Sequence, residues 1–291
     1  MARTVVFGLL GLDSLPFIAT QLLAGYVIVG ALYDQAARRT TLEAPRTLQG
    51  ITMPSGTRLT LRDPDRPASF ESARFPKPVS VYGFETARLT RHLAPAPGDA
   101  VLSLADDQDW NGWRCRAGQP LNVTLNDDGR RAAIRSCVLT ASQTLGETLL
   151  PAGSALRTSS GARYVDGRRG ADRWIVRPPQ NSSIPVAGAH LKAVLRLDSQ
   201  RHLLSARGAL TAPLSLGTMH YPSGTAIRLS FDGQTGAPSA WLLSPGRGQT
   251  ARRDDGPDVE FGVAVAHHSN GDVEQRLSNR EAGFYHIRPL R

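Results

Sequence analysis

The sequence predicts an all-β fold in which repeated β-hairpins form an extended twisted sheet or a sandwich, preceded by one N-terminal transmembrane helix. Leu121, Val123 and Leu125 alternate with polar residues, which is the period-2 pattern of a strand with one buried face. A Pro-small-Gly-Ser/Thr motif recurs along the chain. The 20 Pro and 28 Gly, together with few helical patterns, favour many short strands joined by turns.

Residues 15–33 form an almost wholly apolar segment near the N-terminus. As a helix this segment would span about 28 Å, close to the thickness of the hydrocarbon core of a bilayer. Asp13 or Ser14 can cap its first turn. We therefore predict an uncleaved membrane anchor over residues 1–33, with cleavage after Ala31 as the alternative.

The orientation of this anchor depends on opposing signals. Arg3 precedes the apolar segment, whereas Arg38, Arg39 and Arg46 follow it, and this count favours a cytoplasmic body. The resemblance of the segment to an export signal and a possible disulfide favour the other side. We expect an inner-membrane, single-pass protein whose body lies in the periplasm, with a cytoplasmic body as the alternative.

Four regions follow the anchor. Residues 34–47 are polar and show no periodic pattern, so we predict a linker. A first β-repeat region covers residues 48–158, a loop insert residues 159–183, and a second β-repeat region residues 184–291. The insert is predicted from its arginines and its Pro-Pro pair, which are typical of exposed loops.

The Pro-small-Gly motif predicts a turn followed by a strand in each of its copies. Residues 49–61, 145–156 and 216–229 all show a Gly, a short β-prone run, the motif, and then an alternating strand. Proline presets φ at the first central position of a type II turn, and the following glycine supplies the positive φ that such a turn requires.

The second half of each unit is a strand, a glycine-containing turn and a returning strand. The clearest copy is residues 121–139, where Asp128-Gly129 marks the turn. Less regular copies cover residues 79–93, 191–204, 227–243 and 263–277.

This unit resembles the bacterial β-hairpin repeat proteins of the MORN-like kind. The matching segments are residues 121–139 and residues 263–277, the latter with Asn270-Gly271 at the turn. A variant of those repeats carries a cysteine at positions equivalent to Cys115 and Cys137. The resemblance implies a hairpin sheet, which in such proteins serves as a scaffold, a lipid- or protein-binding surface or an immunity-like factor, and it implies a fold more than an activity.

Cys115 and Cys137 lie at the start of one candidate strand and near the end of its partner. A disulfide between them would stabilise the fold by about 3 kcal/mol in the chain-entropy model and would indicate an oxidising compartment. Two buried free thiols are the alternative. Two cysteines cannot fill a structural zinc site, and no histidine lies nearby at ligand spacing.

Asp107, Asp109 and Asn111, followed by Gly112, are the candidate calcium ligands. They place acid and amide oxygens at every second position, as in the first half of a calcium loop. Gly118 stands where such a loop has its bidentate glutamate. The alternative is an acidic turn before a strand. We expect no other cofactor.

Trp110, Trp113, Arg168 and Arg169 are the candidate binding surface. Tryptophans at strand ends either line a sugar- or peptide-binding face or pack in the core, and we favour packing. His267 and His268 lie in one predicted strand, so their side chains point to opposite faces, and we expect surface histidines. The sequence contains no nucleophile elbow, no metalloprotease motif and no phosphate loop.

The basic excess of this chain consists almost entirely of arginine. The formal net charge is +9, and only Lys77 and Lys192 are lysines. The arginines are scattered and are not interleaved with aromatic residues as a base-stacking surface would be, which disfavours nucleic acid as the partner. We expect charge spread over solvated faces, with an anion-binding surface as the alternative.

These observations lead to three functional hypotheses. The first is a membrane-anchored, non-catalytic β-repeat protein that acts as an envelope scaffold or binding module, with a protein partner or self-association. The second is an envelope hydrolase or glycan-acting enzyme with a site in the inserts. The third is a basic surface that binds anionic lipid or nucleic acid.

Overall fold

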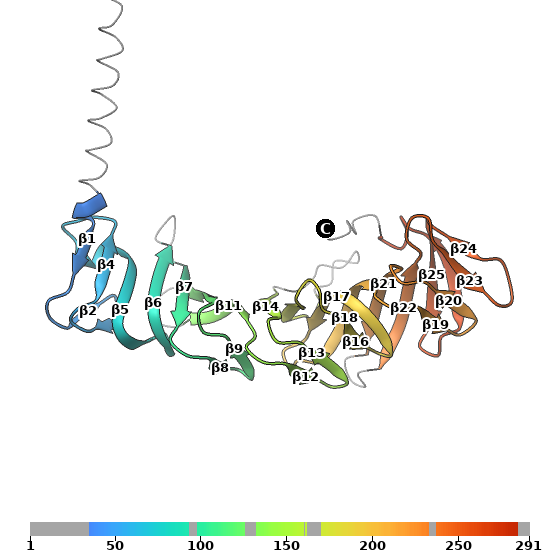
Figure 1. Cartoon of the computed structure of the whole chain (residues 1–291), viewed down its shortest axis with the longest axis horizontal. Helices are drawn as coiled ribbons and strands as arrows, with labels where there is room; N and C mark the ends of the chain where they lie inside the picture. Colours follow the sequence, from blue (N-terminus) through green and yellow to red (C-terminus); the bar gives the residue numbers. More distant parts are fainter. Residues whose placement is uncertain are drawn as a thin grey trace, which may run out of the picture.

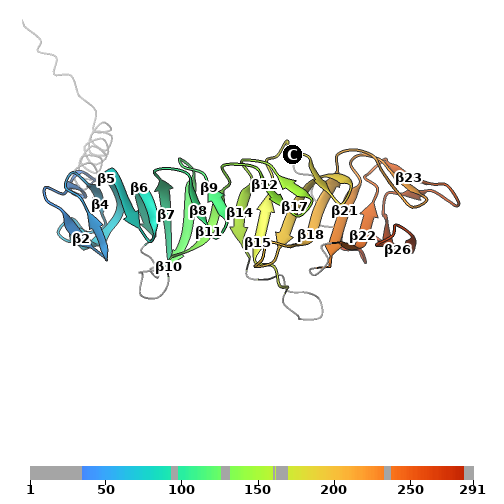
Figure 2. The same ribbon diagram turned by 90° about the horizontal axis from the view of Figure 1, so that it is seen from below.

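The structure is a computed structural model, and it describes residues 35–92, 98–125, 132–159, 161, 170–232 and 237–284. The body is elongated, and the strands of one large sheet follow each other along its long axis (Figures 1 and 2). In the described residues this sheet has 16 strands, all neighbours are antiparallel, and β16 pairs beside the main path. Its order is β1 (Arg39–Thr41), β4 (Arg58–Leu61), β5 (Phe70–Val81), β6 (Phe84–His92), β7 (Asp99–Leu104), β10 (Pro120–Leu125), β11 (Ala132–Val138), β14 (Ala155–Thr158), β15 (Trp174–Arg177), β17 (Ala189–Leu197), β18 (Leu203–Leu210), β21 (Ala226–Phe231), β22 (Pro238–Ser244), β25 (Val263–His268) and β26 (Val273–Ser278).

Short strands form a second layer on one face of the large sheet, and those of the N-terminal and central parts lie along the lower side in Figure 1. Most of them are three residues long, and several bury their first and third side chains, as β3, β9 and β13 do. These strands are β2 (Arg46–Leu48), β3 (Ile51–Met53), β8 (Gln108–Trp110), β9 (Trp113–Cys115), β12 (Gln143–Leu145), β13 (Thr148–Leu150), β16 (Ile184–Val186), β19 (Leu214–Leu216), β20 (Met219–Tyr221), β23 (Thr250–Arg253) and β24 (Val259–Glu260).

A continuous apolar core separates the two layers and runs from Leu42 to Val265. The long strands alternate between this core and solvent, as in β10, where Leu121, Val123 and Leu125 are buried. The short hairpins cover these residues with large side chains such as that of Trp113. Burial of apolar area at roughly 25 cal/mol per Å² is therefore the main force that holds the layers together.

Two-residue turns close the short hairpins of the second layer. Three of them place a non-glycine residue and then glycine at positive φ, as Gln49 (+53°) and Gly50 (+77°) do. The other two are Asn111-Gly112 and Ala187-Gly188, and Tyr82-Gly83 forms the same turn between β5 and β6 of the large sheet. Positive φ at both central residues defines the type I′ turn, whose twist matches that of the flanking strands.

The three Pro-small-Gly motifs form the same turn each time. In the first copy the carbonyl of Pro54 accepts hydrogen bonds from the backbone N–H of Thr57 (3.3 Å) and from its hydroxyl (2.7 Å). Ser154 and Thr225 make the equivalent bonds to Pro151 and Pro222. The glycine has positive φ as predicted, but the proline occupies the first corner of the turn and not a central position.

The prediction of an all-β fold with a large sheet is confirmed, whereas two local predictions differ from the structure. The linker predicted for residues 34–47 contains β1 and most of β2, and the loop insert predicted for residues 159–183 contains β15. Strands of three or four residues are too short to show alternation in the sequence. The predicted anchor, residues 1–33, lies outside the described residues, and no helix within those residues is long and apolar enough to cross a bilayer.

The face of the large sheet that points away from the short hairpins is called here the open face. Its residues alternate with the buried ones and are mostly Arg, Ser and Thr, for example Thr60, Ser72 and Thr90, which lie opposite one another in β4, β5 and β6. At the C-terminal end, residues 279–284 cross this face. There Ala282 and Phe284 are buried together with Ala264.

Candidate functional site

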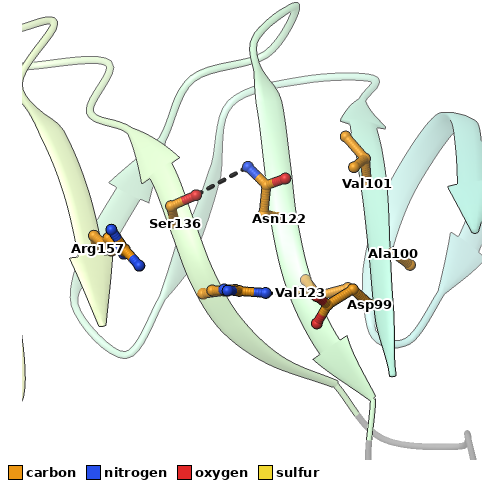
Figure 3. A pocket seen from close by; sticks show the side chains of 8 residues that line it. Asp99, Ala100, Val101, Asn122, Val123, Ser136 and Arg157 are labelled. Atoms are coloured by element: carbon orange, nitrogen blue, oxygen red, sulfur yellow. Dashed lines mark hydrogen bonds and ion pairs between the residues drawn. The ribbon is translucent and has the colours of Figure 1, made fainter. Parts of the chain in front are cut away.

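A hollow of about 420 Å³ lies near the centre of the open face, over β7, β10, β11 and β14 (Figure 3). It is lined by Asp99, Ala100, Val101, Asn122, Val123, Arg135, Ser136 and Arg157. β10 and β11 shift register between Asn122 and Val123, and such a bulge bends a strand and increases its twist.

The polar side chains of this hollow are partly paired with one another. Arg135 forms an ion pair with Asp99 at 2.5 Å, and Asp99 also accepts a hydrogen bond from the Thr124 hydroxyl at 3.3 Å. The amide of Asn122 donates to the hydroxyl of Ser136 at 2.9 Å (Figure 3). Both members of the ion pair are well exposed, so solvent weakens it and it contributes little to stability.

A second hollow of about 340 Å³ continues the first across β14 and β15. Asn122, Ser136 and Arg157 line both hollows, and Arg177 lines the second. Together the two hollows form a shallow groove that crosses the strands, which we call the central groove. In the described structure Arg157 and Arg177 are exposed and form no ion pair.

Arg157 and Arg177 are diagonal neighbours on adjacent strands, because Ala155 lies opposite Arg177 and Ile175 lies opposite Arg157. Diagonal neighbours in an antiparallel pair lie about 7–8 Å apart. Two guanidinium groups at this separation can bind one anion between them or two anionic groups of one chain.

The central groove is not among the sites predicted from the sequence. Its residues come from strands far apart in the chain, and only the register of the sheet brings them together. The signal that the sequence offers is Arg157, which follows the buried Leu156 in β14 and therefore points to solvent.

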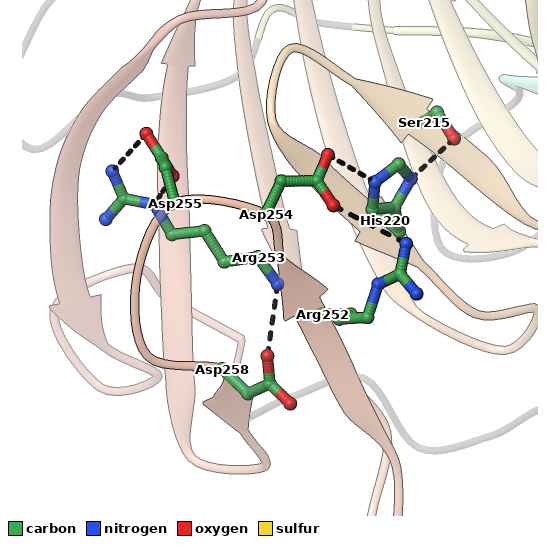
Figure 4. A network of polar contacts seen from close by, with 7 residues as sticks. All are labelled: Ser215, His220, Arg252, Arg253, Asp254, Asp255 and Asp258. Atoms are coloured by element: carbon green, nitrogen blue, oxygen red, sulfur yellow. Dashed lines mark hydrogen bonds and ion pairs between the residues drawn. The ribbon is translucent and has the colours of Figure 1, made fainter.

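A polar network joins Ser215, His220 and Asp254 on the short hairpins (Figure 4). The Ser215 hydroxyl lies 2.9 Å from Nδ1 of His220, and Nε2 of that ring lies 2.8 Å from a carboxylate oxygen of Asp254. Arg252 also contacts Asp254, at 3.4 Å. The residue types are those of a hydrolase triad, but here the serine meets Nδ1 and the acid Nε2, and the side chains of His220 and Asp254 are 34% and 52% exposed.

Asp107 and Asp109 each contact other residues of the protein, and Asn111 lies in a turn. Asp107 accepts hydrogen bonds from the Thr140 hydroxyl and from the backbone N–H of Ala117, and these bonds lower the pKa of its carboxyl group. Asp109 lies 3.8 Å from Arg114. Asn111 is a central residue of a type I′ turn, at φ +48°. Within the described ranges, no three His, Cys, Asp or Glu residues are placed to hold a metal ion.

The predicted tryptophan surface is wrong for Trp113, which is fully buried. Its ring packs edge-on against Trp174 at 5.8 Å, and the half-buried Trp110 does the same at 5.9 Å. These rings join a second-layer hairpin to β15 and belong to the core, as the favoured alternative predicted. Arg168 and Arg169 lie outside the described residues.

Cys115 and Cys137 form a disulfide, with their Cα atoms 5.8 Å apart. The bond joins β9 in the second layer to β11 in the large sheet, so it crosses the core beneath the central groove. The alternative of two free thiols does not hold.

His267 and His268 point to opposite faces as predicted, but the expectation that His267 is a surface residue is wrong. His267 is fully buried. Its Nε2 lies 2.6 Å from the Tyr221 hydroxyl and its Nδ1 lies 2.7 Å from the carbonyl oxygen of Gly271. Burial lowers the pKa of His267 and raises that of Tyr221.

Comparison with known proteins found no matching family model, no similar curated protein and no similar solved structure. The resemblance to MORN-like repeats therefore stays a prediction, and the functional argument depends on the geometry of the open face.

Proposed function

We propose that this chain is a non-catalytic binding module, tethered to a membrane by residues 1–33, whose central groove binds an extended acidic polysaccharide. The observation that supports this function is the exposed pair Arg157 and Arg177, which has no carboxylate partner in the described structure and lies in a groove that also offers amide, hydroxyl and carboxylate groups.

The groups of the groove suit a ligand with both anionic and hydroxyl groups. Guanidinium groups bind carboxylate or sulfate through paired, charge-assisted hydrogen bonds. The amide of Asn122 and the hydroxyl of Ser136 both donate and accept hydrogen bonds, and the carboxylate of Asp99 accepts them from sugar hydroxyls. Because the groove crosses several strands, it fits an extended chain better than a compact ligand.

The same groups favour a polysaccharide over a nucleic acid. Proteins that bind single-stranded nucleic acids stack the bases on exposed aromatic rings, whereas none of the described residues that line the two hollows is aromatic.

The proposal is tested with the full chain in nanodiscs and a fluorescein-labelled oligogalacturonate, by fluorescence anisotropy. We expect Arg157→Gln with Arg177→Gln to weaken binding at least tenfold, since charge-assisted hydrogen bonds contribute about 1.5–3 kcal/mol each. The exposed loop residues Arg62 and Arg247 provide a matched control, because their replacement by Gln removes the same charge outside the groove. Equal loss in the control pair, or displacement of the probe by single-stranded DNA as readily as by unlabelled oligogalacturonate, would contradict the proposal.

A hydrolase is the second candidate function, because Ser215, His220 and Asp254 are in contact. If Ser215 were a nucleophile, a fluorophosphonate probe would label it, and His220→Ala would abolish the labelling. We expect no labelling, because Ser215 and His220 form an exposed cross-strand pair and Arg252 shares the carboxylate of Asp254.

A further inference from the structure

Three arginines form a ladder at the N-terminal end of the open face. Arg58 of β4 lies directly opposite Arg74 of β5, and Arg74 lies directly opposite Arg88 of β6. All three side chains are exposed. Neighbouring strands lie about 4.8 Å apart, so this N-terminal ladder places three positive charges in a row across the sheet.

The ladder has no nearby carboxylate in the register of the sheet. Its outer neighbours are Thr41 and Ser103, and the adjacent row is Thr60, Ser72 and Thr90. No ion pair involves a ladder residue in the described structure. Like charges directly opposite each other destabilise a sheet, so this arrangement has a cost that the fold does not require.

Several other arginines of the open face have partners. Arg135 is paired with Asp99, and Arg196 is paired with the buried Asp172. Arg228 donates to the carbonyl oxygen of Ala282 at 2.7 Å. In the described structure, the exposed arginines of this face without an anionic partner therefore include the ladder as well as the groove pair Arg157 and Arg177.

The position of the ladder in the chain identifies its partner. β1 pairs with β4, and Arg39 of β1 lies on the same face as Arg58, since Arg39 is opposite Thr60. Only five residues separate Tyr33, the end of the apolar segment, from Arg39, so an extended chain bridges at most about 20 Å between them. A membrane anchor over residues 1–33 would therefore hold the ladder next to the lipid headgroups.

We propose that the N-terminal ladder docks on the anionic lipid headgroups of the membrane that holds the anchor. The inference rests on the predicted anchor and goes beyond polysaccharide binding, which uses residues of other strands. Docking would lay the N-terminal end of the sheet against the bilayer surface. Each basic residue close to an anionic membrane contributes about 1 kcal/mol, which corresponds to roughly fivefold in the docking equilibrium.

The test uses the full chain in nanodiscs made of phosphatidylcholine alone or mixed with phosphatidylglycerol. Ser72→Cys, beside the ladder on the open face, carries a bimane label, and both native cysteines are in the disulfide and do not react. Nitroxide-headgroup lipids quench bimane on contact. We expect strong quenching only with phosphatidylglycerol, and replacement of Arg58, Arg74 and Arg88 by Gln lowers the docking constant on the order of 100-fold.

Two matched variants control for fold and for total charge. Replacement of the three ladder residues by Lys retains the charge and retains docking. High salt releases the docked sheet from the bilayer in both the native chain and this Lys variant. Replacement of Arg157, Arg177 and Arg247 by Gln removes as much charge elsewhere and leaves quenching unchanged. The inference is overturned if quenching is as strong in neutral nanodiscs as in those with phosphatidylglycerol, or if the control variant loses as much quenching as the ladder variant. It is also overturned if the chain associates with neither kind of nanodisc. Oligogalacturonate binding is retained in the ladder variant, so failure of one proposal is separable from failure of the other.

Discussion

The ring of His267 is buried between the layers, and both of its nitrogens are in hydrogen bonds. The carbonyl oxygen of Gly271 can only accept, so Nδ1 carries the proton and Nε2 accepts from the Tyr221 hydroxyl. A second proton on the ring would remove this acceptor and bury a charge. Burial therefore lowers the pKa of His267, and the neutral ring is part of the folded structure.

This residue makes stability depend on pH. In the unfolded chain a histidine has a pKa of about 6.5, so below that pH the unfolded state binds a proton that the folded state does not. We expect the contribution of His267 to the free energy of unfolding to be constant above about pH 6.5. Below that pH this contribution falls, and the protein becomes less stable. Urea denaturation across this range measures the slope. His267→Gln removes part of the slope, and an unchanged slope in that variant would refute the assignment.

Gly208 shows why one position in the middle of a strand has no side chain. It lies opposite Ala193 in β17, and a Cβ atom there would lie 2.0 Å from the carbonyl oxygen of Lys192 and 2.6 Å from the Cα atom of Ala193. Both contacts are with backbone, so no side chain can move aside.

We expect Gly208→Ala to destabilise the protein by about 1–3 kcal/mol, the usual cost of overpacking. Ala209→Ser, on the next residue of the same strand, is the control and should have little effect. The measurement is the urea midpoint with the slope of the transition checked for constancy. A neutral Gly208→Ala variant would show that β17 and β18 can separate at no cost.

At the scale of the element, the recurring turn is the feature that connects sequence with structure. Thr57, Ser154 and Thr225 are fully buried, and each donates its hydroxyl to the proline carbonyl three residues before it, at 2.6–2.8 Å. The backbone N–H of the glycine donates in all three turns to a leucine carbonyl of a preceding strand or loop, at 2.7–2.9 Å.

Because the three turns have the same geometry, loss of their hydroxyls should have the same cost. We expect Thr57→Val, Ser154→Ala and Thr225→Val each to destabilise by about 1 kcal/mol, and their combination to be additive because the sites are far apart. Thr144→Val, at an exposed position of β12, is the control. Costs that differ widely among the three sites would show that the copies are not equivalent.

The sequence predicted those elements whose signal is local. The alternation of Leu121, Val123 and Leu125 and the Pro-small-Gly motif depend on neighbouring residues, and both were read correctly as strands and turns. The short hairpins were missed as a separate layer because three residues show no period. The central groove and the environment of His267 were missed because register joins residues far apart, such as Tyr221 and His267.

At the scale of the whole molecule, the protein is close to a one-dimensional array. Each strand of the large sheet pairs only with its neighbours, and each short hairpin covers the strands beside it. In such arrays stability is approximately a sum of local terms and of the interfaces between neighbouring units. The two ends of the sheet therefore do not stabilise each other directly.

The disulfide lies near the middle of this array, and it joins the two layers across a sequence separation of 22 residues. A crosslink of this size stabilises by roughly 3 kcal/mol by restricting the unfolded chain, and it acts only on the units that it joins. Reduction should therefore destabilise the centre and leave the ends almost unchanged.

Native-state hydrogen exchange tests this expectation. In the oxidised protein we expect the slowest exchange in β7, β10 and β11 and faster exchange toward β1 and β26, because edge strands open locally at low free energy. Replacement of both cysteines by Ala should speed exchange in β7–β14 by about two orders of magnitude, while β21–β26 exchange as before. A uniform acceleration along the whole chain would instead mean that the sheet unfolds as one cooperative unit, and local sums would then not describe its stability.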